Sequence, residues 1–193
     1  MLKEYTAQEM LTLWRRSFGL APSPRAGGFS DATELDEVLA AQIEVWYDRL
    51  LREAPPELLP TADLAGLTAA RATGENSAEI PFPERGVRPL RLRMEGWTRD
   101  VTLFADPASL TASMQSLRHA RACPEDPVAI LFPRLIEAHG LAPAPSLADT
   151  LADASARIPA QRPAPAIERL EMVVRPPEGL YVLDTALLDF INF

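Results

Sequence analysis

Histidine and cysteine, the residue types that most often act as bases, nucleophiles or metal ligands, are scarce in this chain of 193 residues. The two histidines are His119 and His139, and the single cysteine is Cys123. A cysteine close to histidine and arginine can be reactive, because positive charge lowers the thiol pKa. Residues 118–123, Arg-His-Ala-Arg-Ala-Cys, have this composition, but they fall at the end of a predicted helix. We interpret them as structural, since basic residues suit a helix C-terminus and cysteine fills buried gaps.

Other motifs with a known chemical role are missing. The chain has no glycine-rich nucleotide-binding motif, no H-E-x-x-H, no G-x-S-x-G and no C-x-x-C. Its only adjacent glycines, Gly27 and Gly28, precede a predicted helix, where backbone N–H groups can hold an anion. The first turn of that helix is acidic, which opposes phosphate. We therefore predict no cofactor.

Metal and acid–base sites are equally hard to place. His139 stands beside Gly140, as at the end of a helix or strand. Pairing the histidines with Asp126 or Glu137 matches no familiar metal-ligand spacing. The paired carboxylates are explained by helix polarity at residues 36–37 and by a proline-flanked turn at residues 125–126. We predict no catalytic residue and no metal.

Arginines around one predicted strand form the most distinctive polar group. Apolar residues at 90, 92 and 94 alternate with Arg91, Arg93 and Glu95, which is typical of a half-buried strand with its arginines facing solvent. Such a face can simply protect a sheet edge, or it can bind a partner. An acidic protein surface suits it better than nucleic acid, because the chain is acidic and no aromatic residues are interleaved with the arginines. The candidate face comprises Arg85, Arg88, Arg91, Arg93 and Arg99.

The acidic side of the molecule is a separate segment. Residues 31–79 hold 11 acidic and 3 basic side chains, and the rest of the chain holds 16 of each, so the net charge of −8 lies on this segment. A helix predicted over residues 31–53 carries an apolar stripe too broad for one neighbour, which is typical of a helix that also meets another chain. Its candidate interface residues are Asp36, Glu37, Glu44, Trp46 and Tyr47.

The remaining helix signals fix where elements begin and end. Thr6 and Glu9 form a T-x-x-E capping box for a first helix, Tyr5 and Met10 suit a hydrophobic staple, and Gly19 supplies the stop. Arg15 and Arg16 would favour the C-terminal end of its dipole. A weaker helix is expected over residues 61–72, followed by an exposed link over 73–79. Asp106–Pro107 suggests another helix start, with Leu110, Met114 and Leu117 facing inward. A terminal helix is expected after Asp184.

Strand signals dominate the second half. We expect strands at residues 90–94, 101–103, 128–132, 170–174 and 180–183, with a turn at 176–179. Helices followed by strands without regular βαβ alternation predict an α+β fold. In it, an N-terminal helical layer, residues 1–72, packs on a mostly antiparallel sheet within residues 79–193, which ends in a C-terminal helix. Residues 141–165, rich in alanine and proline, form an excursion, and the whole is expected to be one compact domain.

Composition limits where this protein works. The N-terminus lacks the apolar core of a signal peptide, and no apolar run approaches the roughly 20 residues that span a bilayer. A single cysteine forms no internal disulfide. We therefore expect a soluble cytoplasmic protein, or one incorporated into a particle assembled in the cytoplasm, without membrane contact.

These observations favour a non-catalytic structural or adaptor protein that acts through protein–protein contacts. An acidic face and an arginine face on one chain permit head-to-tail contacts between copies or with neighbouring subunits, and such contacts can close into rings. The order of elements is loosely similar in architecture to ring-forming connectors of virus- and phage-like particles. One alternative is a small enzyme that uses Arg91, Arg93 and Asp100 around an anionic substrate. Another is a monomeric module that binds an acidic peptide.

Overall fold

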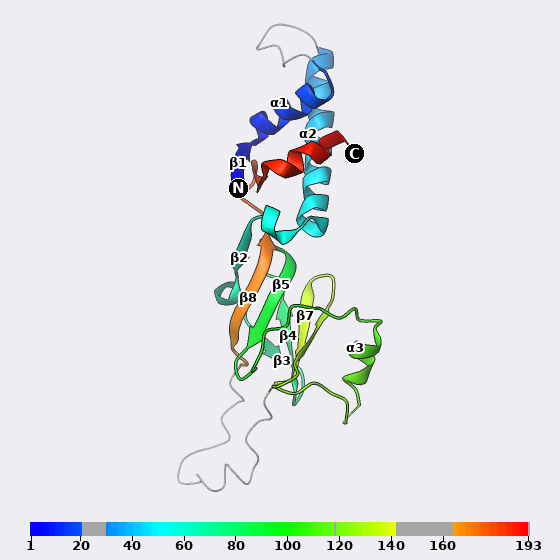
Figure 1. Cartoon of the computed structure of the whole chain (residues 1–193), viewed down its shortest axis with the longest axis vertical. Helices are drawn as coiled ribbons and strands as arrows, with labels where there is room; N and C mark the ends of the chain where they lie inside the picture. The colour runs from blue at the N-terminus through cyan, green and yellow to red at the C-terminus, as the bar shows by residue number, and fades with distance from the viewer. Residues whose placement is uncertain (21–29, 118, 142–163, 193) are drawn as a thin grey trace. The chain divides into compact units, whose positions relative to one another are not determined.

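Residues 1–20, 30–117, 119–141 and 164–192 are described by a computed structural model, and they combine helices with antiparallel strands (Figure 1). The predicted α+β class is confirmed. The described chain divides into two compact units: unit 1 comprises Met1–Ala62 and Val173–Phe193, and unit 2 comprises Asp63–Met172. Both expected boundaries, residues 72 and 79, lie inside unit 2. The packing of a helical layer on the sheet stays a prediction, and Gly27, Gly28 and most of residues 141–165 lie outside the described residues.

Unit 1 joins helices to a two-stranded antiparallel sheet, β1–β9. Its elements are β1 (Leu2–Thr6), α1 (Ala7–Ser17), α2 (Ser30–Glu53), the short 3-10 helix η1 (Pro56–Leu58), β9 (Leu180–Asp184) and the terminal 3-10 helix η3 (Thr185–Asn192). The core contains Met10, Ile43, Tyr47, Leu51 and Leu183, each at most 2 % exposed.

The predicted caps of unit 1 are present. The backbone N–H of Thr6 donates to Glu9 Oε2 at 2.8 Å, and the backbone N–H of Glu9 donates to Thr6 Oγ1 at 3.3 Å, which completes the capping box. Gly19 takes a positive φ of 67° at the end of α1. Asp184 Oδ1 accepts the backbone N–H of Ala186 at 3.0 Å, so the expected terminal helix begins there, although it is 3-10 rather than α.

Strand β1 has no counterpart among the predicted elements. Four of its five residues are exposed and only Tyr5 is buried, so its sequence gives no clear alternation. Pairing with β9, near the other end of the described chain, defines this strand. Leu2 lies opposite Asp184 and Thr6 opposite Leu180. A strand held by such distant pairing carries little local signal.

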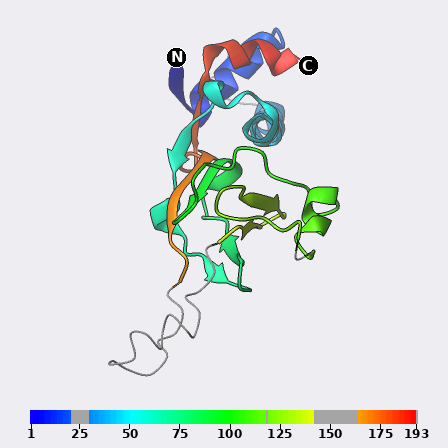
Figure 2. The ribbon, with the colours of Figure 1, turned by 60° about the horizontal axis from the view of Figure 1, so that its bottom comes forward.

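Unit 2 contains the four-stranded antiparallel sheet β3–β4–β7–β6 and the strand β5 (Figure 2). Its elements are the 3-10 helix η2 (Ala65–Leu67), β3 (Arg71–Ala72), β4 (Ser77–Pro81), β5 (Gly86–Met94), α3 (Leu110–Met114), β6 (Val128–Leu131) and β7 (Leu135–His139). Two further strands, β2 (Thr61–Asp63) and β8 (Ile167–Val174), form a sheet in the order β2–β8–β5. The predicted strands at 90–94, 128–132, 170–174 and 180–183 are confirmed.

The helix expected over residues 61–72 is wrong. Those residues form β2, η2 and β3 instead. Asp63 Oδ1 accepts the backbone N–H groups of Ala65 and Leu170, both at 3.0 Å, and the backbone N–H of Leu64 donates to Leu170 O at 2.8 Å. These long-range bonds to β8 outweigh a helix propensity that Gly66 already weakens.

The exposed link expected over residues 73–79 is also wrong in its second half. Strand β4 begins at Ser77, and Ala78 and Ile80 are fully buried. The buried positions alternate with Ser77 and Glu79, which face outward. The alternation covers only a few residues, two of them polar, so it is too short to identify from sequence.

The segment after β5 differs from its prediction in two places. Asp106 caps only a turn, with its Oδ1 accepting the N–H of Ala108 at 2.7 Å, and α3 begins after Ser109. Leu110 and Leu117 are 75 % and 57 % exposed, so the predicted buried face is wrong. The strand expected at 101–103 is reduced to one bridge between Val101 and Leu92. α3 lies apart from the strands in both views (Figures 1 and 2).

Candidate functional site

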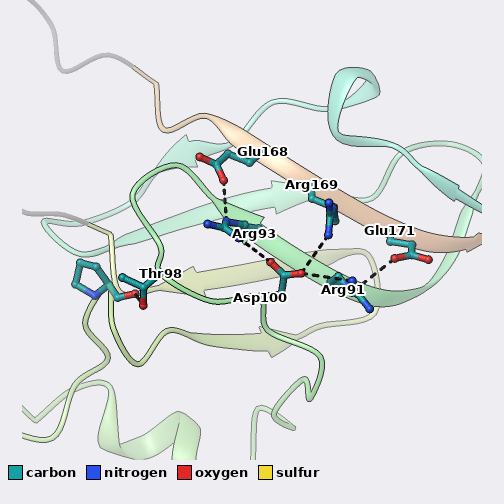
Figure 3. A network of polar contacts seen from close by, with 8 residues as sticks. Arg91, Arg93, Thr98, Asp100, Glu168, Arg169 and Glu171 are labelled. Carbon is teal, nitrogen blue, oxygen red and sulfur yellow. Dashed lines mark hydrogen bonds and ion pairs between the residues drawn. The ribbon is translucent and has the colours of Figure 1, made fainter.

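The candidate site is a cluster of arginines and carboxylates on β5, β8 and the loop that follows β5 (Figure 3). Strand β5 buries Leu92 and Met94 completely, so the alternating Arg91 and Arg93 lie on its other face. Arg169 extends from β8, the neighbour of β5. The predicted alternation is therefore confirmed over residues 91–94, whereas Leu90, expected on the buried face, is only half-buried.

One carboxylate joins these three arginines, which we call the arginine triad: Arg91, Arg93 and Arg169. Asp100 lies 3.6 Å from Arg91 Nη1, 3.5 Å from Arg93 Nη1 and 3.3 Å from Arg169 Nη1 (Figure 3). The side chain of Asp100 is 19 % exposed, whereas those of the arginines are 38–47 % exposed. Asp100 thus lies beneath a solvent-accessible layer of guanidinium groups.

Two glutamates from β8 complete the network. Glu168 Oε2 is 2.8 Å from Arg93 Nε, and Glu171 Oε2 is 3.7 Å from Arg91 Nε. Three arginines therefore face three carboxylates, and the network has no net charge. This part of the predicted arginine face is therefore balanced by carboxylates rather than a bare positive surface, and its role as an interface stays a prediction.

The other three predicted arginines are close to β5 in sequence. Arg99 pairs with Asp126. Arg85 immediately precedes β5, and Arg88 lies in its first half. The cluster that the structure brings together therefore includes two of the five predicted arginines.

On α2 the predicted acidic residues have varied surroundings. Asp36 Oδ1 accepts from Arg15 Nε at 2.7 Å, and the Arg15 side chain is only 7 % exposed. Arg15 lies in the last turn of α1, where the sequence analysis expected it to interact favourably with the helix dipole. The structure shows that it also binds Asp36 of α2. Glu44 accepts a hydrogen bond from the Tyr181 hydroxyl. Glu37 is exposed on the helix surface.

The aromatic candidates on α2 separate into a core residue and a boundary residue. Tyr47 is 2 % exposed, and its hydroxyl donates to Val182 O and accepts from Val182 N, both at 3.0 Å. Burial raises the pKa of Tyr47 to about 12. Trp46 is half-buried, with its ring edge-on to Trp14 at 5.8 Å. Tyr47 is therefore a core residue, and of these two aromatic residues only Trp46 has exposed surface.

The histidine and cysteine candidates lie elsewhere in unit 2. His139 ends β7, as expected, and its Nε2 lies 3.3 Å from Glu137 Oε1. Burial lowers the pKa of His139, against the opposing effect of Glu137. Cys123 is exposed in a turn, so the expected helix end and buried cysteine are wrong. Among residues 1–20, 30–117, 119–141 and 164–192, no three His, Cys, Asp or Glu side chains group into a metal site.

Sequence reasoning missed several members of these clusters. Arg169 and Arg175 lie far along the chain from their partners, and Arg175 pairs with Asp48 of α2. The alternation of Arg169 and Glu171 with buried Leu170 and Met172 is the signal that could have revealed the second arginine strand.

Cavities among the described residues lie elsewhere, and their linings differ. One of about 310 Å³ lies in unit 1 and is lined by Trp46, Arg49, Leu50, Glu53, Ala54, Pro55 and Leu187. A second of about 270 Å³ lies beside α1, and a third of about 160 Å³ lies beside Cys123. The arginine triad lines none of these three.

Comparison with known proteins gives no relative. No protein-family model matches the chain, and searches of curated proteins and of solved structures found no match either. Within the described part of the chain, no helix is both long enough and apolar enough to cross a bilayer.

Proposed function

We propose that this chain is a non-catalytic structural or adaptor protein that acts through protein–protein contacts in a larger assembly. The observation that carries the proposal is an exposed apolar side of α2. Leu35, Val38 and Val45 are 37 %, 54 % and 72 % exposed and share one side of the helix, at spacings of three and seven residues. Apolar surface gathered on one side of a helix favours burial against another protein.

This apolar side is continuous with the core face of α2. Leu39 and Ile43 are 5 % and 2 % exposed, and half-buried Trp46 lies between them and Val45 around the helix. Trp46 also lines the 310 Å³ cavity. The apolar surface of α2 is therefore wider than its own unit covers, which is the feature expected of a helix with a further neighbour.

A second copy of this chain is the occupant that we propose. Residues 30–41 of α2 contain four acidic and no basic residues, and the two arginines of the helix, Arg49 and Arg52, lie near its C-terminal end. Two α2 helices packed antiparallel, with Val38 of each against Val45 of the other, bring the arginines toward the acidic half. Antiparallel packing also opposes the two helix dipoles favourably.

Contact between the acidic segment and the arginine face, which the sequence suggested, is not favoured by charge alone. The arginine triad is balanced by Asp100, Glu168 and Glu171. On α2, Asp36 pairs with buried Arg15. Apolar contact therefore provides the main free energy in this proposal, and charge sets the orientation.

Native mass spectrometry and light scattering of Val45→Glu test the proposal. We expect the unsubstituted chain to form oligomers and Val45→Glu to shift them toward monomer, because a carboxylate is buried in the contact. Ala40→Glu is the matched control, since it adds the same charge at an exposed position on the opposite side of α2. The mass separates a two-fold dimer from a ring, as in a virus- or phage-like connector. A strict monomer at low salt and high concentration would overturn the proposal.

A further inference from the structure

We propose that the arginine triad is a binding site for carboxylates on an acidic segment of a partner protein, and that Asp100 occupies this site as an internal stand-in (Figure 3). The inference rests on the proposed function, because it requires a protein partner. It concerns a surface of unit 2, whereas the self-association proposed above involves α2 in unit 1.

The contacts of Asp100 are long for charged groups. They measure 3.3–3.6 Å, whereas charge-assisted N–H···O bonds are usually about 2.7–2.9 Å. Only the contact with Arg169 is a hydrogen bond, and the buried Oδ1 of Asp100 accepts none from the described residues. Three guanidinium groups thus converge on a carboxylate that fits them loosely.

The backbone around Asp100 explains this loose fit. The next residue, Val101, is fixed to Leu92 of β5 by reciprocal backbone bonds of 2.8 and 2.9 Å. On the other side, Arg99 pairs with Asp126, and the backbone N–H of Thr98 donates to Pro124 O at 3.0 Å. Asp100 is therefore held from both sides and cannot move toward the triad without breaking these bonds. A carboxylate supplied by another chain has no such restriction.

The triad retains the capacity to bind. Each guanidinium has five N–H donors, and the three side chains are 38–47 % exposed. Asp100 stays beneath the guanidinium groups, and an incoming carboxylate binds the exposed donors above it, where shorter bidentate bonds provide the gain.

An acidic protein segment fits this site better than nucleic acid. Glu168 and Glu171 lie at two edges of the triad and repel a continuous row of phosphates. A single aspartate or glutamate side chain can enter between the two glutamates.

Fluorescence anisotropy with a short labelled peptide rich in aspartate and glutamate tests the inference at low salt. Asp100→Asn keeps the side-chain shape and removes the competing charge, so we expect it to tighten binding by about tenfold. Arg91→Gln and Arg169→Gln should each weaken binding by at least a similar factor. Arg134→Gln, at an exposed arginine outside the cluster, is the control and should change little.

Several results would overturn the inference. One is equal peptide affinity of Asp100→Asn and the unsubstituted chain. Another is that Arg91→Gln and Arg134→Gln change peptide affinity equally. A third is that a single-stranded RNA probe binds more tightly than the peptide. If Asp100→Asn does not fold, the comparison of Arg169→Gln with Arg134→Gln decides alone. Val45→Glu should leave peptide affinity unchanged, so the loss of self-association and the loss of peptide binding are measured separately.

Discussion

Two contacts in this chain join arginine to aspartate, but they differ in burial and in distance. In unit 1, Arg15 is 7 % exposed, and its Nε and Nη2 lie 2.7 and 2.6 Å from Asp36 Oδ1. In unit 2, three arginines that are 38–47 % exposed share Asp100 at 3.3–3.6 Å. The first is short and closed to solvent, and the second is long and open. Burial and distance, rather than residue type, separate the buried ion pair from the solvent-accessible one.

The largest expected effect is on the closed pair. Asp36→Ala removes a close ion-pair partner of the buried Arg15, which should lower the free energy of unfolding by about 3 kcal/mol. Urea unfolding followed by tryptophan fluorescence measures it, because Trp14 and Trp46 pack against each other in the same unit. Glu37→Ala, at the exposed neighbouring position, should cost less than about 0.5 kcal/mol. Equal losses for the two variants would remove the distinction between closed and open contacts.

A second prediction concerns the hydroxyl of Tyr47, which holds α2 to β9. Tyr47→Phe leaves both backbone groups of Val182 without this partner and should cost about 1–3 kcal/mol at neutral pH. Chemical denaturation measures this loss directly. Thr68→Val, which removes an exposed hydroxyl bonded to Pro81 O, is the control and should cost less.

The same hydroxyl makes unit 1 sensitive to alkali. Burial raises the pKa of Tyr47 from 10 to about 12, so the folded protein keeps this proton where the unfolded chain loses it. The associated stability is complete below pH 10 and is lost as pH rises toward 12. Tyr47→Phe should therefore flatten the decline in unfolding free energy over this range. An unchanged decline would assign it to other groups, among them Tyr181, whose pKa burial also raises.

Sequence predicted some residues of these contacts but neither of the pairings. Arg91 and Arg93 follow from a two-residue alternation, which is local, and the Thr6–Glu9 capping box follows from a four-residue motif. Arg169 reaches Asp100 across 69 residues, and Arg15 reaches Asp36 across 21, so neither pairing has a local signal. Helices and strands were predictable wherever their signals come from residues close together in sequence. The helix prediction was wrong at residues 61–72, where the backbone N–H of Leu170 donates to Asp63.

The smallest expected effect tests the open network at its edge. Glu168→Gln removes the charge that faces Arg93 at 2.8 Å, but the two side chains are 45 % and 38 % exposed, so solvent already screens the pair. We expect a loss of no more than about 1 kcal/mol at low salt, which disappears near 1 M NaCl. The loss in Asp36→Ala should persist at the same salt, because Arg15 is buried and mobile ions do not reach it. Urea unfolding of both variants at the two salt concentrations measures this difference. A salt-resistant loss in Glu168→Gln would mean that the triad is a closed structural network, and its arginines would then be unavailable to a partner.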